Sequence, residues 1–95
     1  MTDYRLTRLA EADVLDIWSY IAQDNCEAAD RMVDRFTEAY EFLARNPTAG
    51  ERMDQYRPGL RAWTVGRYVV YFCDTGAGIE VDRILHSARR HEDLF

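Results

Sequence analysis

The first half of the chain carries two amphipathic helical patterns joined by a very short segment. Apolar residues recur at helical spacing from Val14 to Ile21 and again from Ala29 to Leu43. The first helix is expected to end near Gln23, and the segment Asp24-Asn25-Cys26-Glu27 resembles a capping box that starts the second. Asn46-Pro47 ends it, because a residue before proline avoids the helical region. Helices joined so closely must form an antiparallel hairpin, and their apolar stripes need a sheet to cover.

The second half changes to an alternation of period two, which is typical of strands. Leu60–Val65 and Tyr68–Asp74 flank Gly66-Arg67, a pair that suits a type II′ hairpin turn. A further turn leads to a third strand, Ile79–His86, and Asp3–Leu6 reads as a short strand that extends the sheet at one edge. Residues 46–59, with two prolines and two glycines, are expected to form a loop.

The pattern therefore predicts the α+β class. We expect an N-terminal strand, an antiparallel two-helix hairpin, and a mainly antiparallel sheet of three to four strands on which the hairpin packs. Thr7 is the expected N-cap of the first helix, and Ser87 is the expected cap of a short C-terminal helical tail.

Arg83 does not fit this pattern, because strict alternation places it on the same face as Ile79, Val81 and Leu85. Three explanations stay open: a bulge that re-aims the side chain, emergence beyond the helical cover, or burial with a carboxylate partner.

Length and charge limit the function. Ninety-five residues predict one domain over 1–95, and the formal net charge of −5 argues against a general nucleic-acid binder. All twelve basic residues are arginine, which favours bidentate contacts and aromatic stacking. No apolar run is long enough to cross a membrane and no signal-peptide pattern is present, so the expected location is the cytoplasm. Cys26 and Cys73 form neither a disulfide framework nor a metal set.

No catalytic motif is present, and the spacing of His86 and His91 is poor for a metal. What remains is a set of arginines and aromatic residues on or just after the predicted strands. Its members are Arg61, Trp63, Arg67, Tyr68, Tyr71, Arg83, His86, Arg89 and Arg90. Such a set is either an ordinary solvated sheet face or a recognition surface, since arginine, tryptophan and tyrosine dominate interface hot spots. The apolar stripes of the two helices are predicted to belong to the hydrophobic core, and only Trp18, Tyr20 or Tyr40 at their margins could contact a partner.

Residues that carry a family resemblance follow one another along the whole chain. They are Tyr4-Arg5-Leu6, Ala12-Asp13-Val14, Ile17–Ala22, Asn46-Pro47, Gly50, Arg57–Arg61, Tyr68–Tyr71, Arg83–His86, Arg89-Arg90 and Leu94-Phe95. As an ordered set they resemble the ParE branch of the RelE/ParE toxin superfamily. Ser87-Ala88 depart from the pattern, which often has glycine beside the arginines.

The resemblance implies the toxin of a type II toxin–antitoxin system, a non-enzymatic protein without cofactor or metal that poisons DNA gyrase. It implies a ParD-like, ribbon-helix-helix antitoxin as the partner in a hetero-oligomer that reaches DNA only through the antitoxin. By position, the expected antitoxin contacts are Arg61, Trp63, Arg67 and Arg83. The residues that resemble the segment linked to toxicity are His86, Arg89, Arg90, Leu94 and Phe95.

Two alternatives stay open within the same fold. A RelE-like ribosome-dependent mRNA endonuclease would use Arg61 or Arg83 to stabilise charge and Glu51 or His86 to move protons. The acidic composition and the absence of lysine argue against it. The other alternative is a non-toxic module that only binds the antitoxin.

Overall fold

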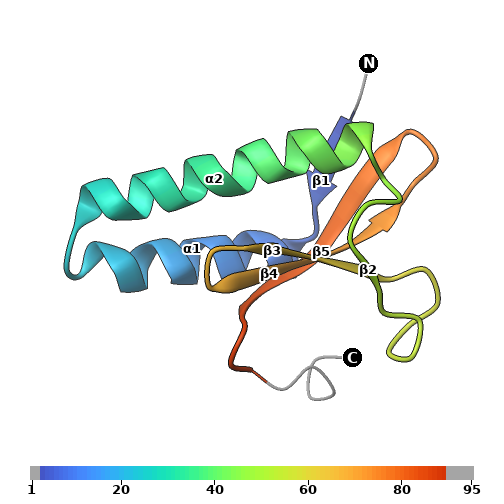
Figure 1. Ribbon diagram of the computed structural model, residues 1–95. Coiled ribbons are helices and arrows are strands. Elements are labelled where there is room, and N and C mark those ends of the chain that lie inside the picture. Colours follow the sequence, from blue (N-terminus) through green and yellow to red (C-terminus); the bar gives the residue numbers. More distant parts are fainter. Residues whose placement is uncertain (1–2, 90–95) are drawn as a thin grey trace.

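A computed structural model provides the structure, which describes residues 3–89. The helices are α1 (Arg8–Ala22) and α2 (Cys26–Arg45). The strands are β1 (Asp3–Leu6), β2 (Glu51–Arg52), β3 (Arg61–Val65), β4 (Tyr68–Asp74) and β5 (Gly78–His86). They form one sheet in the order β1-β5-β4-β3-β2, in which the β1–β5 pair is parallel and the others are antiparallel. The helical hairpin lies on one side of this sheet (Figure 1).

The predicted α+β architecture is confirmed, with the fifth strand as the main difference. β2 is only two residues long and forms within the segment expected to be a loop, where it pairs with Arg61 and Ala62. The prediction of three to four strands missed it because a two-residue pairing leaves no periodic signal. At the other end, Ser87 begins a turn in which the Arg89 amide donates to the His86 carbonyl at 3.0 Å. The predicted helical tail otherwise lies outside the described residues.

Local capping explains where the helices begin. Thr7 is the N-cap of α1, and its hydroxyl accepts from the Ala10 amide at 3.1 Å, as predicted. The cap of α2 is Asn25, whose side chain accepts from the Ala28 amide at 3.0 Å. A capping box that includes Glu27 would need the cap one residue earlier, so the box expected from the sequence is replaced by a simple asparagine cap.

Both faces of the sheet are covered. The main core lies between the helices and the sheet, around fully buried Phe36, Leu43, Val70 and Phe72. A smaller apolar cluster lies on the opposite face, where residues 53–60 fold over β3, β4 and β5. Its buried members are Met53, Leu60, Ala62, Val69, Tyr71 and Leu85. The segment that the sequence presented as a loop is therefore a cover for the second sheet face.

A bulge in β5 allows that strand to serve both cores. Phe72 of β4 pairs with Val81 and Tyr71 with Arg83, so Asp82 is the extra residue. Asp82 is 7% exposed, and its carboxylate accepts from the Arg57 guanidinium and from the Cys73 thiol. Burial raises the pKa of that thiol, so Cys73 stays protonated and acts as a donor.

The N-terminus of α1 replaces a strand at the free edge of β5. β1 pairs with β5 only as far as Val81. Beyond that point the Thr7 amide donates to the Val81 carbonyl at 3.0 Å, and the Thr7 hydroxyl donates to the Asp82 carbonyl at 2.8 Å. The Thr7 side chain therefore caps α1 and also forms a hydrogen bond with the edge of β5.

We expect Thr7→Val to lower the free energy of unfolding by about 1–2 kcal/mol, because it removes the cap and one edge hydrogen bond without changing shape. Urea denaturation followed by circular dichroism measures the loss. Thr37→Val is the matched control, since the Thr37 hydroxyl donates only to the Val33 carbonyl of its own helix at 3.2 Å. Equal losses in the two variants would contradict this role of Thr7.

Candidate partner-binding site

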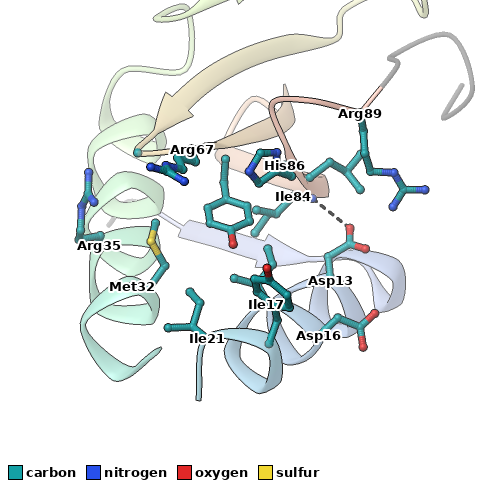
Figure 2. A pocket seen from close by; sticks show the side chains of 14 residues that line it. Asp13, Asp16, Ile17, Ile21, Met32, Arg35, Arg67, Ile84, His86 and Arg89 are labelled. Atoms are coloured by element: carbon teal, nitrogen blue, oxygen red, sulfur yellow. Dashed lines mark hydrogen bonds between the residues drawn. The ribbon is translucent and has the colours of Figure 1, made fainter. Parts of the chain in front are cut away.

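A pocket of about 770 Å³ opens between the helical hairpin and the end of the sheet. Its apolar floor comes from Ile17 and Ile21 of α1, Met32 of α2, Tyr68 of β4 and Ile84 of β5. Figure 2 shows these elements converging on the pocket. The site is assembled from the helical hairpin and from two strands that are distant from it in the sequence.

The pocket exists because the helices are longer than the sheet that they cover. α2 has 20 residues, about 30 Å at 1.5 Å per residue, and its N-terminal end reaches beyond the β3–β4 turn (Figure 1). The amphipathic stripe therefore continues where no strand lies opposite. Ile21 and Met32 are left only half-buried as a result. An apolar surface of this kind needs another cover.

Two tyrosines line the pocket, Tyr68 of β4 and Tyr20 of α1. The ring of Tyr68 packs edge-on against Phe36, with centroids 5.8 Å apart, and against His86, at 5.5 Å. Burial raises the pKa of Tyr68, and the nearby Tyr20 phenol adds to the rise while Arg67 opposes it. Tyr20, in contrast, is 71% exposed at the pocket rim. The site thus offers one fixed aromatic ring and one accessible one.

Cationic side chains surround the apolar floor. Arg67 follows Gly66 in the β3–β4 turn, where Gly66 has a φ of +60° as the first position of a type II′ turn requires. Arg35 of α2 and Arg89 also line the pocket, as does His86, the last residue of β5. Figure 2 shows Arg35 and Arg67 at one end of the pocket and Arg89 at the other, nearer Asp13 and Asp16.

Arg83 is held inside the structure by Asp13. Its Nε and Nη2 donate to the two carboxylate oxygens at 2.8 and 2.9 Å, and the Ile84 amide donates to the same carboxylate at 3.0 Å. The side chains are 19% and 10% exposed. The hydrogen bonds with Asp13 raise the pKa of Arg83, so the guanidinium stays charged. Two of the three explanations left open for Arg83 hold together: a bulge precedes it and a carboxylate binds it.

Two other predicted contact residues lie away from this pocket. The Arg61 guanidinium donates to the Thr48 carbonyl at 3.0 Å. Trp63 packs on Phe42, with ring centroids 5.3 Å apart, beside a smaller groove of about 300 Å³ between α2 and β3. The structure therefore brings Arg67 together with His86 and Arg89, and separates it from Arg61 and Trp63. Arg90, Leu94 and Phe95 lie outside the described residues.

Arg35 and Met32 were not singled out by the sequence patterns. Met32 belongs to the apolar stripe and reads as core, while Arg35 occupies an exposed helix position like several other arginines. Tyr20, considered as a marginal residue of the stripe, does reach the rim. No local signal distinguishes Arg35, because its place at the pocket depends on a contact with a turn 31 residues away in the sequence.

Neither a metal centre nor a membrane-spanning helix is found among residues 3–89. No group of three or more histidine, cysteine or acidic side chains is arranged there to hold a metal. No helix in that part of the chain combines the length and the apolar character needed to cross a bilayer.

The comparisons with known proteins agree with this architecture. A family model described as the ParE toxin of type II toxin–antitoxin systems, parDE, matches residues 4–91. The chain belongs to the ParE toxin family. Toxin ParE1 of Caulobacter vibrioides is 35% identical over 95 residues, a match that covers 96% of this chain and 98% of that protein.

A solved structure supports the ParE assignment at the level of the fold. A chain of the chromosomal ParDE toxin–antitoxin system from P. aeruginosa superposes with a TM-score of 0.74 and 27% sequence identity. The match covers 90% of this chain and 96% of that one. The resemblance to ParE toxins inferred from the sequence is therefore confirmed, and the chain is a ParE-type toxin of a type II toxin–antitoxin system.

Proposed function

We propose that this toxin binds and inhibits DNA gyrase, and that a ParD-like antitoxin neutralises it by filling the pocket between the helical hairpin and β5. The observation that carries the proposal is the uncovered apolar floor beside cationic side chains in a protein of net charge −5. Without a partner, half-buried Ile21 and Met32 stay in contact with water. An acidic and apolar segment that becomes ordered on binding matches both features of the pocket.

The pocket also joins residues that the sequence assigned to different tasks. Arg67 was expected to contact the antitoxin, whereas His86 and Arg89 were expected to contact the target. All three line the same cavity. An antitoxin seated there covers His86 and Arg89, which belong to the proposed target contacts. The antitoxin would then neutralise the toxin by covering residues that the toxin needs to contact its target.

For the remaining predicted contacts we propose two different roles. Trp63 borders the smaller groove between α2 and β3, where a second part of the antitoxin would lie. Arg61 begins the same strand and would contact that part of the antitoxin beyond the groove. Arg83 acts indirectly, since Asp13 already binds its guanidinium and holds the end of β5 that leads to His86. The complex is proposed to be a cytoplasmic hetero-oligomer that reaches DNA only through the antitoxin.

The geometry favours inhibition by binding over the ribosome-dependent nuclease. Among the described residues, the four candidates for nuclease chemistry do not gather in one place. Glu51 lies on β2, Arg61 bonds to a carbonyl, Arg83 is paired with Asp13, and only His86 lines the main pocket. General acid–base catalysis requires such groups within hydrogen-bond reach of the same reacting atoms. No cofactor or metal enters the proposed mechanism.

We expect co-expression with the protein encoded beside it to yield a stable complex on affinity purification. Toxin released from that complex should inhibit DNA supercoiling by purified gyrase and leave ribosome-bound mRNA intact. Adding back the antitoxin should restore supercoiling.

Each alternative makes a different prediction in the same experiment. Cleavage of ribosome-bound mRNA, lost in His86→Ala, would establish the nuclease in place of the gyrase inhibitor. Complex formation without inhibition of either target would establish the non-toxic module. Recovery of this chain alone, soluble and harmless, would contradict antitoxin binding itself.

A further inference from the structure

Arg35 lies against the turn that carries Arg67. A Cβ atom added to Gly66 would be 3.1 Å from Nη1 of Arg35, so the guanidinium rests on the backbone of this turn. Arg67 is the next residue along the turn, and both arginines line the pocket. Helix α2 and the β3–β4 turn thus bring two guanidinium groups to one end of the cavity (Figure 2).

The positive charge at this end is not neutralised by a salt bridge within residues 3–89. The ion pairs found in that range join Arg5 to Glu80, Arg52 to Asp54, Arg57 to Asp82 and Arg83 to Asp13. At the opposite end of the pocket, Asp13 is occupied by Arg83, and Asp16 lies on the same side as Arg89 (Figure 2). The turn end of the pocket therefore presents two arginines, Arg35 and Arg67, whereas the acidic lining residues lie at the other end.

Two neighbouring guanidinium groups repel each other unless an anion lies between them, and each presents a planar fork that suits a carboxylate. The apolar floor beside them, with Ile21 and Met32, lowers the local dielectric when a partner covers it and strengthens such a contact. An aspartate or glutamate next to an apolar side chain has the chemistry that satisfies both parts of this end of the pocket.

We propose that Arg35 and Arg67 form a carboxylate clamp that receives an acidic residue of the antitoxin, with an adjacent apolar residue of the antitoxin seated on Ile21 and Met32. This clamp rests on the proposed antitoxin complex, and it sets the direction in which the antitoxin segment lies in the pocket. The acidic part of the bound segment lies at the turn, and the rest of the segment runs towards β5 and Arg89. Arg35 and Arg67 then contribute to the choice of partner, because an antitoxin without that acid leaves two cations unpaired.

The test is the affinity of the purified antitoxin for the full toxin chain carrying Arg35→Gln, Arg67→Gln or both. Each single change should weaken binding about 10- to 100-fold, the range expected for hydrogen bonds to charged groups. The double variant should lose less than the product of the single losses, because both arginines bind one carboxylate. Arg31→Gln is the matched control, since this exposed arginine of α2 does not line the pocket.

Replacement of each acidic antitoxin residue by its amide identifies the acid in the clamp. The amide variant of that residue should bind wild-type toxin and Arg35→Gln toxin with similar affinity. Unchanged melting temperatures show that each variant is folded. If wild-type complex forms and both arginine variants bind as tightly as Arg31→Gln, the clamp is overturned and the antitoxin proposal stands. If wild-type toxin forms no complex, both are overturned.

Discussion

Replacing Asp13 by alanine is expected to lower the free energy of unfolding by about 3 kcal/mol. For a chain of this size, such a loss lowers the melting temperature by roughly 10 °C or more. The change leaves the Arg83 guanidinium, which is 19% exposed, without its carboxylate partner. It also leaves the Ile84 amide, at an edge of β5 that no strand covers, without an acceptor. Unpaired buried charges and amides carry their full desolvation cost.

Urea denaturation of Asp13→Ala measures this loss, and two variants show its origin. Asp13→Asn keeps an acceptor for the Ile84 amide and should lose less stability. Asp16→Ala removes an exposed carboxylate from the same helix and should change the free energy of unfolding by no more than about 0.5 kcal/mol. Similar losses in Asp13→Ala and Asp16→Ala would contradict a structural role for the pair.

Replacing Ile21 by lysine is expected to reduce antitoxin affinity at least about 100-fold, which is the scale of an interface hot spot. Ile21 lies on the apolar floor of the pocket and is only half-buried in the free chain. A lysine there replaces the apolar contact with a charge that loses its hydration when the antitoxin covers the pocket. Titration calorimetry of the purified antitoxin into the toxin measures the change.

Leu15→Lys is the matched control for this experiment. Leu15 is on the same helix and is 63% exposed, but it does not line the pocket. It should bind the antitoxin like wild type. Loss of binding in Leu15→Lys with full binding in Ile21→Lys would place the antitoxin on the outer face of α1 and contradict the proposed site.

The helices and long strands follow from the sequence because their information is local. Val14, Ile17 and Ile21 repeat at helical spacing, and the Gly66-Arg67 turn sets the register of β3 and β4. The second apolar cluster also left a signal. Met53 is a large apolar residue in the expected loop, Leu60 is the first residue of the predicted strand that follows, and both are buried on the second face of the sheet. Met53 belongs to no periodic pattern, so it predicts no element.

The candidate site follows less completely from the sequence, since its contacts join distant segments. Asp13 and Arg83 are 70 residues apart, and nothing near either residue indicates the pairing. Arg35 reaches the pocket only because α2 packs beside the β3–β4 turn. The sequence therefore grouped the arginines of the strands, whereas the structure regroups Arg67, His86 and Arg89 with residues of both helices.

The location of the antitoxin is tested most directly by the isoleucine methyl groups. The chain has four isoleucines, of which Ile17, Ile21 and Ile84 line the pocket and Ile79 lies in the core next to β1. In a selectively labelled sample, antitoxin binding is expected to shift the δ1-methyl signal of half-buried Ile21 strongly and to leave that of fully buried Ile79 nearly unchanged. A stable complex in which the Ile21 signal does not move would contradict the proposed site.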